Sequence, residues 1–211
     1  MRLNHVRCTT QHILLLALTL AVGGCATTKP RHQWTEDALH AETAQLTGDL
    51  DAAEKPYETL LPDAPNEEKR RWLLYNNGLL ALQREDVALA RQRFAKVYEA
   101  EVQDEHGANS MYEVAKLASP GEEIEARLAV CRRFPNQVAA EFALQDIVSR
   151  QLGEADHAGL EALLVALLGD VDDTELADNV WFELALVRYE HLKQPDEALD
   201  AYRELLKLFP K

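Results

Sequence analysis

The sequence of 211 residues is poor in cysteine, and the few cysteines leave no framework of disulfides. Only three are present, and two of them, Cys8 and Cys25, lie within the first 25 residues. Cys131 is then left without a partner. Because Cys131 lies beside Leu128 and Phe134 in an expected helix, we predict a small buried core residue and not a nucleophile.

The sequence also lacks the spaced motifs of common enzymes. It has no glycine-rich phosphate loop, no G-x-S-x-G turn and no H-E-x-x-H helix. The histidines beyond the first 25 residues include no pair four residues apart, so no zinc site is predicted. These histidines are His32, His40, His106, His157 and His191. We therefore expect a protein that is not an enzyme, with no catalytic residue, metal or cofactor.

A single acidic segment, 170–175, has the style of a calcium loop. It lacks glycine at the sixth position, and Trp181 stands where the bidentate glutamate would be. We interpret it as a loop in which Asp172, Asp173 or Thr174 caps the following helix.

Basic residues are scarce relative to acidic ones. The chain has 22 lysines and arginines against 36 aspartates and glutamates, a formal charge of −14. A surface this acidic is expected to avoid nucleic acid and anionic lipid head groups. Solvated faces and helix starts explain most of the acids, and a basic client peptide is a second possibility.

No hydrophobic run is long enough to span a bilayer, which takes about 20 residues. The longest apolar-rich run, Ile13–Val22, follows a segment that carries Arg2 and Arg7 and no acid. A basic start, a short apolar run and small residues after it are typical of a secretory signal.

The end of that run, Val22-Gly23-Gly24-Cys25, resembles the bacterial lipobox. The resemblance implies cleavage before Cys25 and acylation of its thiol, palmitate included, which anchors the chain without crossing the membrane. Ala26 follows the cysteine, which in lipoproteins implies transport to the outer membrane, facing the periplasm. An ordinary signal peptide with Cys25 as a free or disulfide-forming thiol is the alternative.

We therefore divide the chain into a cleaved signal peptide (1–24), a lipidated tether (25–36) and a helical domain (37–211). The tether is polar and contains Pro30. Trp34 either packs on the helical domain or lies in the membrane interface, and we favour packing.

What the sequence has in abundance is a helical pattern that repeats. Residues 178–211 predict two helices separated by a break at 193–195, where Pro195 starts the second helix and Pro210 ends it. The first helix carries Val180 and Phe182 on its apolar stripe, and the second carries Ala198, Tyr202, Leu205 and Leu206. Such a pair needs a neighbour of the same kind to bury its stripe.

The pattern is a small residue, an aromatic four positions on, an apolar residue three further and a proline five later. Its best copies are Ala53, Tyr57, Leu60 and Pro65, then Ala90, Phe94 and Val97, and finally Ala198, Tyr202, Leu205 and Pro210. Gly48 and Gly78 take the places of small turn and helix residues. Weaker copies keep Pro135 but have Glu123 and Arg127, or keep Gly153, Ala158 and Ala162 but end at Asp170.

This pattern resembles the tetratricopeptide repeat, whose period is about 34 residues. The resemblance implies an all-α, right-handed α-solenoid of about five helix pairs over nearly the whole domain. In this family the first helix of each pair lines a concave face that binds extended peptides or partner helices. Asn76 and Asn77 are similar to the asparagines of chaperone-tail clamps, but the clamp lysines are missing, so that activity is not expected.

The inferred register places seven residues on the concave face. They are Trp72, Tyr75, Leu79, Tyr112, Arg150, Glu183 and His191. Aromatic side chains flanked by charges are typical hot spots of peptide grooves. Trp72 and Tyr75 could equally be core residues between helix pairs.

The plan of lipobox, tether and five repeats is similar to the lipoprotein of the β-barrel assembly machine and to pilus pilotins. We therefore expect a non-catalytic, lipid-anchored scaffold in a Gram-negative envelope assembly machine, with periplasmic or outer-membrane proteins as partners. The alternative is a regulator that docks on a cell-wall enzyme or an energy-coupling complex.

Overall fold

The structure, a computed structural model, describes residues 31–210, with side chains from Gln33 onward. The predicted signal peptide, Cys25 and the first part of the predicted tether lie outside the described residues. The first helix begins at Arg31, inside the segment 25–36 that the sequence predicts as tether. Trp34 is buried, and its indole Nε1 donates to the Leu60 carbonyl over 3.2 Å, so the prediction that Trp34 packs on the domain is confirmed.

The described residues form five helix pairs and contain no strand. The pairs are α2 (Arg31–Leu46) with α3 (Leu50–Leu60), α4 (Glu67–Gln83) with α5 (Val87–Tyr98), α6 (Glu105–Lys116) with α7 (Glu123–Arg133), α8 (Val138–Gly153) with α9 (His157–Val171), and α10 (Leu176–Leu186) with α11 (Pro195–Leu208). A π-helix, η1 (Val187–His191), continues α10.

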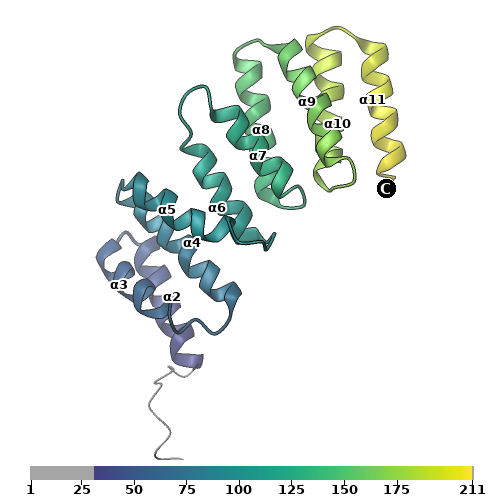
Figure 1. Cartoon of the computed structure of the whole chain (residues 1–211). Helices are drawn as coiled ribbons and strands as arrows, with labels where there is room; N and C mark the ends of the chain where they lie inside the picture. Colours follow the sequence, from purple (N-terminus) through teal and green to yellow (C-terminus); the bar gives the residue numbers. More distant parts are fainter. Residues whose placement is uncertain (1–30, 211) are drawn as a thin grey trace, which may run out of the picture.

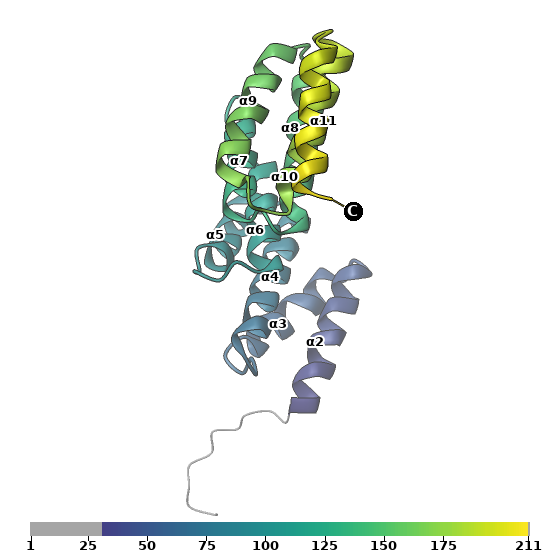
Figure 2. The same cartoon turned by 90° about the vertical axis from the view of Figure 1, so that its right-hand side faces the viewer.

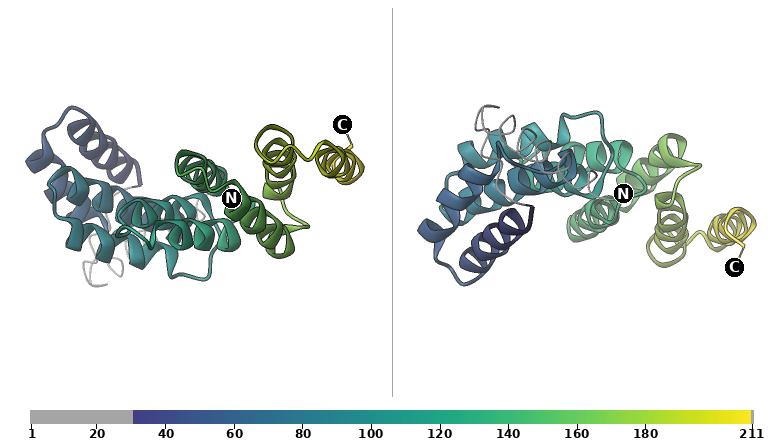
Figure 3. Two further views of the ribbon diagram at one scale, coloured as in Figure 1. Left: turned by 90° about the horizontal axis from the view of Figure 1, so that it is seen from above. Right: turned by 90° about the horizontal axis from the view of Figure 1, so that it is seen from below.

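The pairs follow one another along an elongated, curved array, from α2 and α3 at one end to α10 and α11 at the other (Figure 1). The view turned by 90° shows α7 and α9 on one side of the array and α8 and α10 on the other (Figure 2). Seen from above and below, α2 and α11 lie at opposite ends (Figure 3). The chain is therefore all-α, as the repeat pattern predicts.

Each pair turns through one residue in the left-handed backbone region. Within residues 31–210 a positive φ occurs only at Gly48, Glu85, Gly121, Ala155 and Lys193, which lie 34 to 38 residues apart. The residue that follows each of them precedes the second helix of its pair. Asp49, Asp86 and Asp156 cap that helix by accepting a hydrogen bond from the N–H three residues on. This recurrence shows that the third and fourth units, which have weak sequence signatures, also fold as helix pairs.

The small residues of the pattern allow the two helices of a pair to approach closely. A Cβ atom added at Gly78 in α4 would lie 2.4 Å from the ring of Phe94 in α5. Ala53, Ala90 and Phe94 are fully buried, as the pattern predicts. At these positions a larger side chain would separate the helices, because protein interiors leave no spare volume.

The buried residues form one large cluster and two smaller ones. The large cluster joins α6 through α10 and η1 and is mainly aliphatic, with Leu144, Leu160, Leu164 and Leu167 among its fully buried residues. Cys131 belongs to it and is fully buried, as predicted. Burial raises the pKa of this thiol to about 12, so it is a thiol and not a thiolate at neutral pH.

Two predictions for the last pair are wrong in part. Phe182 and Leu206 were both expected on buried stripes, but their side chains are 45% and 70% exposed. Ala198, which was also expected on the stripe, is buried as predicted, and Ala201 is the other buried residue of α11.

Candidate partner-binding surface

The predicted groove residue Trp72 lies in the packing between the first two pairs. Its ring meets Trp34 edge-on at 6.5 Å between centroids and Tyr57 at 6.0 Å. The Tyr57 hydroxyl donates to Gln45 Oε1 over 2.8 Å. Trp72 is half-buried in the core cluster of these pairs, which is the packing role that the sequence left open.

Tyr75 and Leu79 pack around Phe94. The Tyr75 ring lies 5.9 Å from Phe94 and stacks at 6.2 Å on His106, which comes from the next repeat. Burial raises the pKa of Tyr75 to about 12, and the acidic side chains of Glu113 and Glu105 add to the shift. Leu79 packs on the small cluster of Ala81, Ala90 and Phe94. Much of the side-chain surface of Tyr75 and Leu79 is therefore also buried inside the fold.

Tyr112 of α6 reaches across to α8. Its hydroxyl donates to Asp146 Oδ2 over 3.0 Å, and its ring lies 6.2 Å from that of Phe142. Burial and this hydrogen bond raise the pKa of Tyr112 to about 12. Arg127 of α7 donates to the same carboxylate oxygen over 2.9 Å. Asp146 thereby joins three helices and is neutralised by a cation.

Arg150 lies one turn further along α8, on a cleft of about 150 Å³ that Asp146 and Arg127 also line. Its Nε is 2.8 Å from Glu154, and one of its terminal nitrogens is 3.8 Å from Glu123. Asp146, which accepts the hydrogen bond from Tyr112, therefore lines the same cleft as Arg150.

Glu183 of α10 lies beside α8. Its Oε1 accepts a hydrogen bond from Gln145 Nε2 over 3.0 Å. The neighbouring Phe182 is 45% exposed, and Phe142, one turn before Gln145 on α8, is 55% exposed. We call the group formed by Tyr112, Phe142, Gln145, Phe182 and Glu183 the α6–α8–α10 surface; at its edge the Phe182 ring also meets that of Tyr202 in α11 at 6.2 Å.

His191 lies apart from this surface, at the end of η1. Its ring stacks on that of His157, with centroids 4.5 Å apart and the planes tilted by 26°. His157 begins α9, so this contact joins the last two pairs at the end where their helices turn. A π-helix adds one residue to the helical turn and shifts the residues after it around the axis.

Phe142 and Gln145 are functional candidates that the sequence did not single out. Whether a residue of a first helix faces a groove or the core depends on the neighbouring pair, and one residue of register moves it by about 100°. Phe142 lies in the fourth unit, where the repeat signature is weak. The feature that identifies Phe142 as a candidate is the exposure of its side chain. That exposure depends on how the helix pairs assemble, so the sequence alone does not reveal it.

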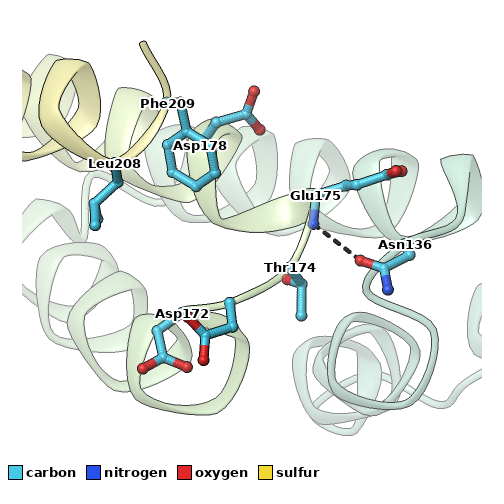
Figure 4. Close-up of a pocket in the computed structure, with 8 residues that line it drawn as sticks. Asn136, Asp172, Thr174, Glu175, Asp178, Leu208 and Phe209 are labelled. Carbon is cyan, nitrogen blue, oxygen red and sulfur yellow. Dashed lines mark hydrogen bonds between the residues drawn. The ribbon is translucent and has the colours of Figure 1, made fainter.

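A wider cleft of about 610 Å³ lies between the end of α11 and the turn that joins α9 to α10 (Figure 4). Its lining combines acids with an apolar wall and comprises Asn136, Asp172, Asp173, Thr174, Glu175, Asp178, Leu208 and Phe209. No group of His, Cys, Asp or Glu within residues 31–210 is arranged to hold a metal ion.

The predicted helix cap in this turn is wrong. Glu175 precedes α10 without a side-chain cap bond, and Thr174 donates to the Val171 carbonyl over 2.7 Å. The Glu175 N–H instead donates to Asn136 Oδ1 over 2.9 Å, as the dashed line in Figure 4 shows. Asn136 lies in the turn before α8, so the cap comes from the preceding repeat.

In residues 31–210 these features define an all-α solenoid of helix pairs that exposes aromatic side chains on its first helices. In the part of the chain that the structure describes, no helix has both the length and the apolar character needed to cross a membrane.

The sequence matches no protein-family profile and no curated protein. Among solved structures the chain is similar to the crystal structure of the MamA protein, with a TM-score of 0.44 and 15% sequence identity. The similarity covers 83% of this chain and 91% of that one.

Proposed function

We propose that this chain is a non-catalytic scaffold that binds partner proteins on its α6–α8–α10 surface. The observation that carries the proposal is the exposure of two phenylalanines, Phe142 and Phe182, on neighbouring first helices. Exposed aromatic side chains on a rigid platform are typical anchors of protein interfaces. The aliphatic cluster behind them holds the platform without help from these rings.

The chemistry of the surface describes the partner segment that would fit. Apolar side chains of the partner would cover Phe142 and Phe182, which water now contacts. Glu183 would accept hydrogen bonds from a partner lysine, arginine or backbone N–H, in competition with Gln145. Asp146 is held by Tyr112 and Arg127 and is less available. An extended or helical segment with alternating apolar and basic residues matches this arrangement.

The lipobox-like sequence ending at Cys25 supports a lipid anchor in the outer membrane, with the helical array in the periplasm. Acylation at Cys25 would restrict the array to the membrane surface and raise its effective concentration near envelope proteins.

Within that compartment we assign the scaffold to a machine that assembles outer-membrane proteins or pilus secretins. The support is the shared plan of lipobox, tether and five helical repeats. A regulator of a cell-wall enzyme or of an energy-coupling complex would need the same anchor and the same surface, so the partner decides between them.

The test is crosslinking in intact cells, followed by detergent extraction, affinity purification and mass spectrometry. Three variants accompany the natural chain: Cys25→Ser, the double variant Phe142→Ser with Phe182→Ser, and a matched control, Leu39→Ser with Leu46→Ser. The control residues are exposed leucines of α2, at the far end of the array. Circular dichroism and thermal melting establish that each variant is folded.

We expect barrel-assembly or secretin components with the natural chain and the leucine control, and their loss with the phenylalanine variant. The Cys25→Ser chain should lose them because it is no longer held at the membrane. Cell-wall enzymes recovered in the same pattern would replace the assembly assignment with the regulator. Partners that are unaffected by the phenylalanine variant would refute the α6–α8–α10 surface.

A further inference from the structure

The last helix of the array, α11, exposes an apolar stripe. Leu199 and Leu206 are 47% and 70% exposed, and Tyr202 between them is half-buried against Phe182, with ring centroids 6.2 Å apart. In Figure 2, which views the array from this end, α11 lies in front of the other helices. No described residue covers the stripe.

The same positions in the earlier second helices bind the next repeat. The position equivalent to Leu199 is the fifth residue of each second helix. It is occupied by Glu54, Arg91, Arg127 and Glu161, and each of these four side chains makes a polar contact with the following pair. Glu54 is 3.2 Å from Arg84, and Glu161 is 2.7 Å from Arg188. In α11 this position is Leu199.

The position seven residues further on is also packed in the core of other repeats. Phe134, which directly follows α7, and Leu168 of α9 occupy it, and both lie in the large core cluster. Tyr98 occupies it in α5 and packs on that cluster, which belongs to the later repeats. In α11 this position is Leu206. The stripe is therefore the stacking face of a repeat, with leucine where the other repeats have a partner.

We infer that a second copy of this chain covers the stripe, with the two α11 helices packed antiparallel. The argument for a second copy is the placement of charge beside the stripe. Asp196 and Arg203 are both exposed and lie seven residues apart on the same flank of Leu199 and Tyr202.

Antiparallel packing of two such helices sets Leu199 of one copy on Tyr202 of the other, and Leu206 on Pro195. The same register places Asp196 of each copy beside Arg203 of the other, which gives two complementary pairs. A parallel pair would instead put these flanks of the two copies on opposite sides of the contact, so that Asp196 and Arg203 would face the uncharged flank of Ala198 and Leu205. The charge pattern is therefore self-complementary in one orientation only.

Arg203 is free to make this contact at little cost. It pairs with Asp200 over 3.0 Å within its own helix, but both side chains are more than half exposed. Exposed pairs of this kind contribute little to stability, so exchanging Asp200 for Asp196 of the second copy loses little.

The test uses the full chain, extracted in detergent with its native amino terminus and examined by density-matched sedimentation equilibrium. The natural chain should dimerise reversibly. Leu199→Glu with Leu206→Glu should abolish the dimer, whereas Leu39→Glu with Leu46→Glu, on exposed leucines of α2, should preserve it. Circular dichroism confirms that each variant is folded.

The charge variants test the occupant itself. Asp196→Arg alone and Arg203→Asp alone should each raise the dimer dissociation constant at least about tenfold, because like charges then meet twice. A mixture of the two variants should recover dimers, since each aspartate again faces an arginine. A natural chain that remains monomeric at about 100 μM would overturn the inference, because a useful self-association must be tighter than this. A dimer insensitive to these variants, or a different protein bound to the stripe of a monomer, would overturn it as well.

Discussion

The first two helix pairs and the last three are held together by different kinds of side chain. The first two pairs use aromatic edges and buried polar groups, among them Trp34, Trp72, Tyr57 and Arg71. The last three share one continuous aliphatic cluster centred on residues such as Leu164. The aromatic side chains of the early pairs pack against one another between the helices. In the later pairs leucine and alanine fill the core, and Phe142 and Phe182 remain exposed.

The comparison shows that the residues most similar to a repeat signature are not the best candidates for function. Small and aromatic residues recur at fixed spacing because adjacent helices must fit together. A residue outside the signature, on a platform already stabilised by others, is free to bind a partner. We therefore locate binding on residues outside the signature, on the first helices of the last three pairs.

The largest expected effect is on the aliphatic cluster. Leu164→Ala should lower the free energy of unfolding by about 3 kcal/mol, since it leaves a cavity in a fully buried position. Phe142→Ala, on the same platform, should change it by no more than about 0.5 kcal/mol. Guanidinium denaturation followed by circular dichroism measures both values. Equal losses would show that Phe142 is part of the core and not of a binding surface.

A second prediction concerns the polar packing of the early pairs. Arg71 is almost fully buried, and its guanidinium donates to Asp104 over 2.6 Å and to the Val102 carbonyl over 3.3 Å. Arg71→Ala should lower the free energy of unfolding by about 3 kcal/mol, because it breaks a buried pair at the junction of two repeats.

Arg84 is the matched control for this prediction. It contacts Asp51 and Glu54 at the surface, so Arg84→Ala should lower the free energy of unfolding by no more than about 1 kcal/mol. If Arg71→Ala and Arg84→Ala lower the free energy of unfolding by similar amounts, buried polar contacts do not distinguish the early pairs from the later ones.

A third, smaller effect is a dependence of stability on alkaline pH. Tyr75 in the early pairs and Tyr112 in the later ones both have a pKa raised from 10.0 to about 12, mainly by burial. Above pH 10 the unfolded chain releases these protons and the folded chain keeps them. The stabilisation is therefore fully present below pH 10 and is lost as the pH rises toward 12.

Urea unfolding across this pH range measures the effect. Tyr75→Phe and Tyr112→Phe should each flatten the pH dependence, because phenylalanine has no proton to release. A dependence as steep in both variants as in the natural chain would assign it to other groups.

The fold was predictable from the sequence because its determinants are local. The spacing of Ala53 and Tyr57, or of Ala90 and Phe94, identifies the residues of the second helix that pack inside their helix pair. The sequence also predicts the last turn between helices correctly, because Pro195 begins α11. These features depend on neighbours a few residues away.

The proposed binding surface was predictable only in part because it depends on contacts between repeats. Tyr112 and Glu183 were anticipated, and the structure places both on the α6–α8–α10 surface. Phe142 was missed, and His191, the last residue of the π-helix η1, lies apart from that surface. Trp72 was placed on the groove by the inferred register, with a core role left open, and its edge contacts come from Trp34 and Tyr57 in another pair. Neither the π-helix nor these distant neighbours leave a mark in the local sequence.

The most direct measurement of the central claim is site-specific photocrosslinking in living cells. A photoreactive amino acid replaces Phe142, Phe182 or the exposed Leu39 of α2 in turn. We predict ultraviolet-dependent adducts with another protein at 142 and 182 and none at 39. Adducts at 39 with none at 142 and 182 would contradict the account and move the binding surface to the early pairs.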